Sequence, residues 1–104
     1  MSTEALILAS IPHGRENGTS MAALARATGM SEREVRAEIE RLVTVDHEPI
    51  VTLPTNPGIF RAETIEECRQ ARAQIRSRAF SLLRRDRGLR LAEQNMVFAD
   101  GRLF

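Results

Sequence analysis

The stretch ATGMSEREV, residues 27–35, predicts two helices that meet at a tight corner. Gly29 favours the left-handed backbone conformation with which many helices end. Ser31 and Glu34 have the spacing of a capping box, in which each side chain accepts a hydrogen bond from the other residue's backbone amide. We therefore expect one helix to end at Gly29 and the next to begin at Ser31.

Helical patterns extend outward from this corner on both sides. Residues 20–29 (SMAALARATG) are rich in alanine, and residues 31–45 place Val35, Ile39 and Leu42 on one face of a helix. A short first helix is expected to begin at Ser2 or Thr3 and to end before Pro12, and the glycine-rich residues 11–20 form a polar connector.

After residue 46 the pattern changes to short runs of β-branched and aromatic residues. PIVTLP (49–54) and GIFRAE (58–63) predict a two-stranded hairpin with its turn at residues 55–58. Such a hairpin is only marginally stable alone and is expected to pack against the helices. Thr64 and Glu67 form a second capping box, which begins a long helix. The expected fold is mostly α with a small β-hairpin: a domain at 1–63, a long Arg-rich helix at 64–94 and a short tail at 95–104.

Length and composition limit the class of protein. A chain of 104 residues supports one compact domain with one appended element. The single cysteine, Cys68, excludes an internal disulfide, and no apolar run approaches the length of a membrane span. With no signal-like segment at the start, a cytoplasmic location is expected and no membrane partner is inferred.

The spacing of residues around the corner resembles the helix-turn-helix motif. Counted from the first position of that motif, a small residue stands fifth, glycine ninth and a branched apolar residue fifteenth. The matching residues are Met21, Leu24, Ala25, Thr28, Gly29 and Val35. One departure is Glu38, which occupies the usually apolar eighteenth position, so that Ile39 takes this role one residue later.

With a helix before it and a hairpin after it, the segment from residue 3 to 63 resembles the winged helix-turn-helix DNA-binding family, which includes small bacterial and phage transcription regulators. The resemblance implies that helix 31–45 enters the major groove while the hairpin, or wing, touches the backbone or minor groove. The residues that it offers to the groove are Ser31, Arg33, Glu34, Arg36, Ala37 and Arg41.

Each of these residues has an expected task. Arg33 and Arg36 can bond guanine edges, Glu34 can accept from cytosine, and Ala37 can contact a thymine methyl group. Phosphate contacts are expected from Thr19, Ser20 and Arg26, together with free amides at the start of the second helix, and wing contacts from Asn56 and Arg61.

Charge is divided unevenly along the chain. Residues 1–60 contain five arginines and eight acids, whereas residues 61–104 contain ten arginines and six acids. Between Arg69 and Arg90 the one acid, Asp86, stands among eight arginines, and Arg69, Arg72, Arg76, Arg87 and Arg90 gather on one side of a helix. Such crowding destabilises a helix unless an anion is near, so phosphate is a candidate partner. A solvated flank and pairing with the acids of a partner protein are the alternatives.

Two functions are compatible with these features. The first is sequence-specific binding of double-stranded DNA by a bacterial or phage transcription regulator. The second is a winged-helix module for protein interaction that uses the Arg-rich helix against an acidic protein, such as a phage factor acting on a host protein. The second follows from helix 31–45, which carries three arginines against four glutamates and is less basic than a reading helix normally is.

The final helix also predicts self-association. Its apolar stripe comprises Ile65, Cys68, Ala71, Ile75, Ala79 and Leu82. Part of the stripe is expected to cover the core, and the distal half to pack on a second copy, because a helix of this length exceeds what so small a body can cover. The residues predicted for a homodimer are Ile75, Ala79, Phe80, Leu82, Leu83 and Leu89.

Other chemistry finds little support in the sequence. His13 and His47 are isolated, with no ligand-spaced cysteine or carboxylate, so no metal site is expected. Phosphate-binding, dinucleotide and nucleophile motifs are absent from the sequence, so neither a cofactor nor an enzyme activity is predicted. Periodicity gives no basis for a small-molecule pocket.

Overall fold

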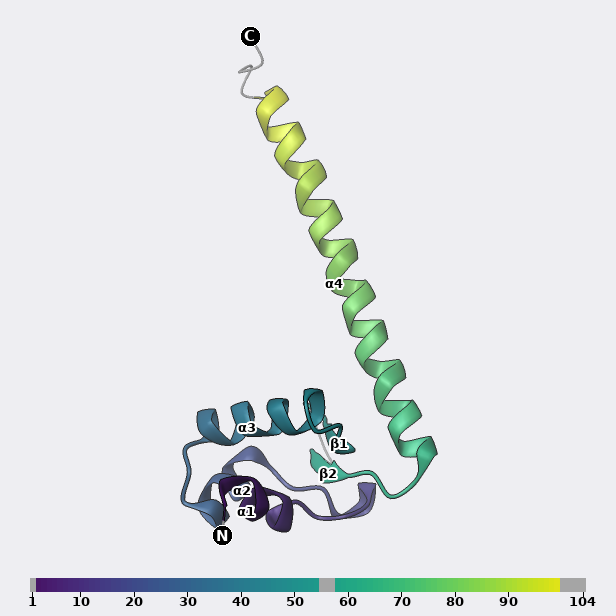
Figure 1. The fold of residues 1–104 in the computed structure, drawn as a ribbon. Helices are drawn as coiled ribbons and strands as arrows, with labels where there is room; N and C mark the ends of the chain where they lie inside the picture. The colour runs from purple at the N-terminus through teal and green to yellow at the C-terminus, as the bar shows by residue number, and fades with distance from the viewer. Residues whose placement is uncertain (1, 55–57, 100–104) are drawn as a thin grey trace. The chain divides into compact units, whose positions relative to one another are not determined.

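A computed structural model describes residues 2–54 and 58–99 and divides the chain into two compact units, residues 1–69 and 70–104. The elements are α1 (Thr3–Ser10), a short 3-10 helix η1 (Arg15–Asn17), α2 (Met21–Thr28), α3 (Glu32–Thr44), β1 (Ile50–Thr52), β2 (Ile59–Arg61) and α4 (Ile65–Ala99) (Figure 1). The chain is mostly helical with a two-stranded antiparallel hairpin and a long C-terminal helix, as the sequence predicts.

The corner between α2 and α3 has the predicted geometry. Gly29 ends α2 in the left-handed conformation, with φ +74°, and its amide donates to the carbonyl of Ala25 at 2.9 Å. The Ser31 hydroxyl accepts from the Glu34 amide at 3.1 Å, and the Ser31 amide donates to the Glu34 carboxylate at 3.2 Å. The capping box of α3 is therefore complete.

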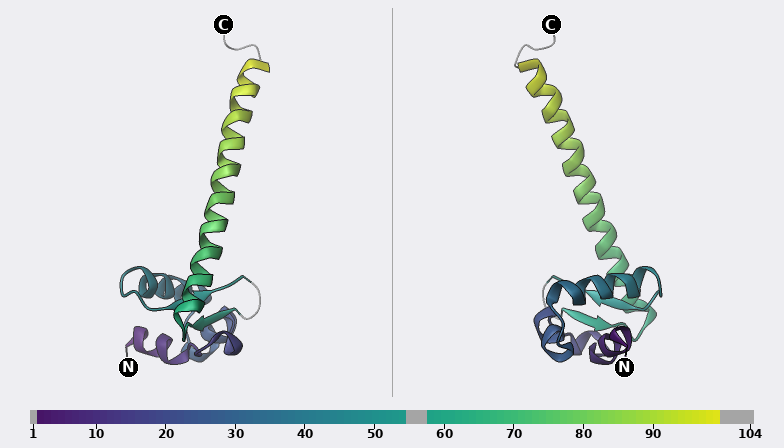
Figure 2. Two further views of the ribbon diagram at one scale, coloured as in Figure 1. Left: turned by 90° about the vertical axis from the view of Figure 1, so that its right-hand side faces the viewer. Right: turned by 60° about the vertical axis from the view of Figure 1, so that its left-hand side comes forward.

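The core of the first unit is formed by side chains from its three helices and the hairpin. Val35, Ile39 and Leu42 are buried, as the periodicity of α3 predicts. The other members of the buried cluster are Ile7, Ile11, Leu24, Ile50 and Ile59. Figure 2 shows the ribbons of α1, α2, α3 and the hairpin gathered together in the first unit.

The hairpin pairs Val51 with Phe60 at its centre. Of its predicted turn at residues 55–58, residues 55–57 lie outside the described residues. The other edge of β2 pairs with the connector between α1 and α2. Thr19 and Ile59 exchange two backbone hydrogen bonds of 2.8 Å each. Gly58, with φ +90°, allows this close approach, because a Cβ at that position would lie 2.3 Å from the carbonyl oxygen of Thr19. The connector therefore ties the hairpin to the start of α2.

The start of α4 is held by its own capping box and by the connector. The Thr64 hydroxyl accepts from the Glu67 amide at 3.1 Å, as predicted. The Glu67 carboxylate also accepts from the amides of Glu63 at 2.7 Å and Arg15 at 2.9 Å. These backbone hydrogen bonds, that from Glu63 first, lower the pKa of Glu67. The contact with Arg15 joins residues that are 52 positions apart, and sequence spacing alone did not indicate it.

The long helix differs from the sequence expectation in two respects. It continues to Ala99, so residues 95–99, assigned to the tail, are helical. Within the first unit, Ile65, the first residue of the predicted apolar stripe, is 71% exposed and does not cover the core as expected. None of the described helices combines the length and apolar character that crossing a membrane requires.

Candidate nucleic-acid interface

The leading half of α3 presents three of the predicted base contacts to solvent. Arg33, Arg36 and Ala37 are all exposed. They lie away from the buried face of the helix, whose members are Val35, Ile39 and Leu42. Burial of that face sets the rotation of α3, and this rotation makes the two arginines available to a ligand.

Arg33 and Arg36 form no ion pair with any described residue. Glu32, four residues before Arg36 on α3, forms no ion pair with Arg36 either, so the two charges on this face do not neutralise each other by direct contact. Arg26 on α2 is likewise exposed and unpaired among the described residues. These three guanidinium groups retain their full set of donors for an external acceptor.

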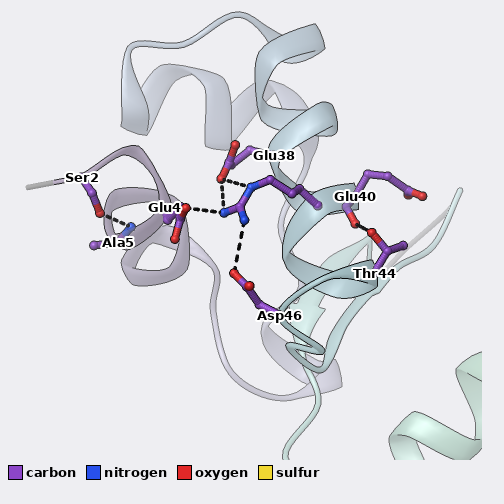
Figure 3. Close-up of polar contacts among 8 residues, drawn as sticks. Ser2, Glu4, Ala5, Glu38, Glu40, Thr44 and Asp46 are labelled. Atoms are coloured by element: carbon purple, nitrogen blue, oxygen red, sulfur yellow. Dashed lines mark hydrogen bonds and ion pairs between the residues drawn. The ribbon is translucent and has the colours of Figure 1, made fainter.

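Arg41 is not free in this way, contrary to the prediction that it contacts DNA. Its guanidinium bonds Glu38 at 2.7 Å, pairs with Glu4 on α1, and lies 3.5 Å from Asp46 (Figure 3). The hydrogen bond to Glu38, helped by the nearby carboxylates, raises the pKa of Arg41. Arg41 therefore joins α1 to the end of α3, and its pair with Glu4, far earlier in the chain, is the contact that local spacing did not indicate.

The two residues predicted as wing contacts, Arg61 and Asn56, also differ from the expectation or lie outside what is described. Arg61 pairs with Glu48 at 2.9 Å, and only 24% of its side chain is exposed. This pair links β2 to the segment before β1, so Arg61 acts within the fold rather than as a free wing contact. Asn56, the second predicted wing residue, lies outside the described residues.

Several of the remaining residues that were predicted to contact DNA form the hydrogen bonds of helix caps instead. The Glu34 carboxylate is bonded to the Ser31 amide and the Ser31 hydroxyl to the Glu34 amide, so neither is held ready for a base. At the start of α2, the Ser20 hydroxyl accepts from the Ala23 amide at 3.0 Å. The backbone of Thr19 is paired with β2. The Ala23 amide and the Thr19 amide are thus not available to phosphate.

Glu40 is a residue on this face that the sequence interpretation left out. It is exposed and lies three residues after Ala37, and therefore on the same side of α3. Its carboxylate would oppose a phosphate close to the helix, or would accept a hydrogen bond from a cytosine amino group. The 3.6-residue period of the helix was the signal that could have identified it.

The two units have opposite charge. The first contains seven arginines and eleven acids, and the second contains eight arginines and three acids. The predicted cluster is continuous in α4, and its arginines between positions 72 and 90 are all exposed. Within the cluster, Arg69 pairs weakly with Glu66 at 3.5 Å. Attraction for an anion is therefore concentrated in the long helix.

Among residues 2–54 and 58–99, no three histidine, cysteine or acidic side chains are grouped so that they could hold a metal ion. His13 and His47 are both exposed. His47 lies in the turn after α3, where its backbone adopts a positive φ of 59°.

Comparison with known proteins gives no match: none was found among family models, curated proteins or solved structures. The candidate function is therefore inferred from the residues and their geometry.

Proposed function

We propose that the first unit is a winged helix-turn-helix domain that binds duplex DNA with sequence preference and regulates transcription. One observation carries this proposal: Arg33 and Arg36 are exposed and unpaired at the leading end of α3, directly after the Gly29 corner. Two other arginines of the same unit, Arg41 and Arg61, are paired with carboxylates. The free donors are thus on the part of α3 that would enter a major groove.

The tasks of the residues follow from their chemistry. Arg33 and Arg36 would bond guanine O6 and N7, and Ala37 would contact a thymine methyl group. Arg26 would hold a phosphate next to the groove. Arg41 and Arg61 would support the domain from within, by fixing α3 to α1 and β2 to the segment before β1.

The long helix would supply affinity without sequence preference. Its exposed arginines would attract the phosphate backbone and offset the acidic balance of the first unit. Phosphate neutralisation releases counterions, so log affinity should fall with log salt at a slope of about −0.9 for each phosphate contacted.

A second candidate, a module that binds another protein, is favoured by one observation. The first unit has eleven acids and seven arginines, and α3 itself carries four glutamates. A basic partner would meet such a surface without the repulsion that DNA phosphates experience. In this case α3 would contact a protein, and no DNA sequence would be preferred.

Selection from a random duplex library with the purified full chain separates the two functions. The proposal expects an enriched sequence that binds at least about 1,000-fold more tightly than random duplex at physiological salt. Equal and weak binding of selected and random duplexes, with Kd on the order of 10⁻⁴ M or higher, would favour the protein-binding module.

Single substitutions then test the proposed reading residues. Arg33→Ala and Arg36→Ala should each weaken binding of the enriched sequence by about 5-fold to 200-fold and relax preference at one base pair. Arg15→Ala is a matched control, because Arg15 is exposed, carries the same charge, and lies on η1 outside α2 and α3. If all three substitutions weaken the selected and random duplexes equally, α3 is not the reading helix.

A further inference from the structure

The long helix carries a row of large apolar side chains that recur every seven residues. The row comprises Ile75, Leu82, Leu89 and Met96. These side chains are 63%, 56%, 66% and 65% exposed, respectively. A seven-residue repeat follows one line along a helix that supercoils with a partner at 3.5 residues per turn. The row therefore supplies one apolar line along which another helix can pack, and the residues three and four positions after each member complete the contact.

Residues beside the row have opposite charges on its two sides. The first flank, three residues after each row member, contains Arg78, Arg85, Ala92 and Ala99. The second flank, four residues after each row member, contains Ala79, Asp86 and Glu93. The alanines allow a second helix to approach closely, and the charges limit the directions in which it can approach.

The charge pattern distinguishes the two possible orientations of a second copy. In a parallel pair related by a twofold axis, the first flank of each helix meets the second flank of the other. Arg85 then faces Asp86 of the second copy, and the twofold axis repeats this ion pair. In an antiparallel pair with Leu82 opposite Leu89, each flank meets itself, so Arg85 would face Arg85 and Asp86 would face Asp86. Like charges in these positions oppose association.

We propose that two copies of the chain associate through α4 as a parallel, in-register pair of helices, with the row at residues 75, 82, 89 and 96 as their seam. This inference depends on α4 alone and is independent of what the first unit binds. It changes the homodimer residues expected from the sequence: Met96 is added. Phe80 is removed because it is five residues from Ile75, roughly 140° around the helix. Leu83 is also off the row.

The first unit includes the first turn of α4 and continues into the rest of that helix at Arg69 and Gln70. A parallel pair therefore carries both first units at the same end of the paired helices. An antiparallel pair would carry them at opposite ends. For a DNA-binding first unit, the parallel arrangement is the one compatible with two neighbouring half-sites.

Sedimentation equilibrium of the full chain tests the seam. The wild type should be a dimer at tens of micromolar. Leu82→Glu with Leu89→Glu should weaken the dimer at least about 100-fold, because four carboxylates would be buried in the seam. Phe80→Glu with Leu91→Glu is the matched control, since these residues are 62% and 54% exposed but lie off the row. A monomeric wild type, or equal effects of the two double variants, would overturn the proposal. Circular dichroism during thermal unfolding reports whether the first unit remains folded in each variant.

Disulfide trapping tests the orientation. In a Cys68→Ala background, which removes the one native thiol, Met96→Cys should be oxidised to a covalent dimer under mild conditions. An antiparallel pair would hold the two thiols at opposite ends and give no such product. A dimer by sedimentation without this crosslink would therefore overturn the parallel assignment.

A charge exchange tests the ion pair. Arg85→Glu should weaken the dimer about threefold to tenfold, because a glutamate would then face Asp86. Adding Asp86→Arg should restore the affinity, since the pair is re-formed with its charges reversed. If Arg85→Glu has no effect, or the second substitution gives no rescue, the two residues do not face each other.

Discussion

Gly58 offers a sharp test of how the hairpin is held, because Gly29 provides an internal control. Both glycines have positive φ, +90° and +74° respectively. Alanine in such a conformation is strained by roughly 1–2 kcal/mol at either position. At Gly29 no atom lies within 4 Å of the added Cβ, whereas at Gly58 the Thr19 carbonyl oxygen would be 2.3 Å away.

The collision at Gly58 involves backbone on both sides, so a side-chain rotation cannot relieve it. The connector and β2 must separate, and the two hydrogen bonds between Thr19 and Ile59 are then lost. Each such bond contributes about 1 kcal/mol. Gly58→Ala should therefore destabilise the first unit by about 3–4 kcal/mol, against about 1–2 kcal/mol for Gly29→Ala.

Urea unfolding followed by far-ultraviolet circular dichroism measures this difference, since the chain has no tryptophan or tyrosine. Thermal unfolding should show a fall in Tm of about 12–30 °C for Gly58→Ala and about 4–15 °C for Gly29→Ala. Equal losses of stability in the two variants would refute the close approach between Gly58 and Thr19.

Three further predictions concern single residues. Gly88 lies in the middle of α4, and no other atom lies within 4 Å of the Cβ that an alanine would add there. Gly88→Ala should stabilise the helix by about 0.5–1 kcal/mol, and circular dichroism should show higher helicity. Glu67 has a lowered pKa in the folded chain, so its stabilisation is present above its unfolded pKa of about 4.3 and is lost as pH falls through the folded pKa. Glu67→Gln should accordingly lower Tm at pH 7 but change it little at pH 2, and equal losses at both pH values would contradict the carboxylate's role. Arg41→Met should lower Tm by a few degrees, because it leaves Glu4, Glu38 and Asp46 without their common partner. It should leave the preference among DNA sequences unchanged. A loss of preference like that of Arg33→Ala would return Arg41 to the set of base contacts.

The features that could be predicted from the sequence are those set by neighbouring residues. The corner at Gly29, the capping boxes of α3 and α4, and the buried face of Val35 and Ile39 all follow from spacing within a few residues. Their physical basis is local, because backbone conformation, capping and periodicity act over one or two helical turns. The row that ends at Met96 has the same origin; its members Ile75, Leu82 and Leu89 were predicted, and Met96 was left out because the helix was expected to end at residue 94.

The sequence by itself therefore determined the order of helices and strands, the rotation of α3, and which residues that helix turns outward. Only the tertiary structure decided which of the predicted contacts are free. Arg41 is occupied by Glu4, Arg61 by Glu48 and the backbone of Thr19 by Ile59. These partners are 37, 13 and 40 positions apart in the chain. Such pairs are created when separate elements pack on a common core, and no pattern within a single helix or strand specifies them.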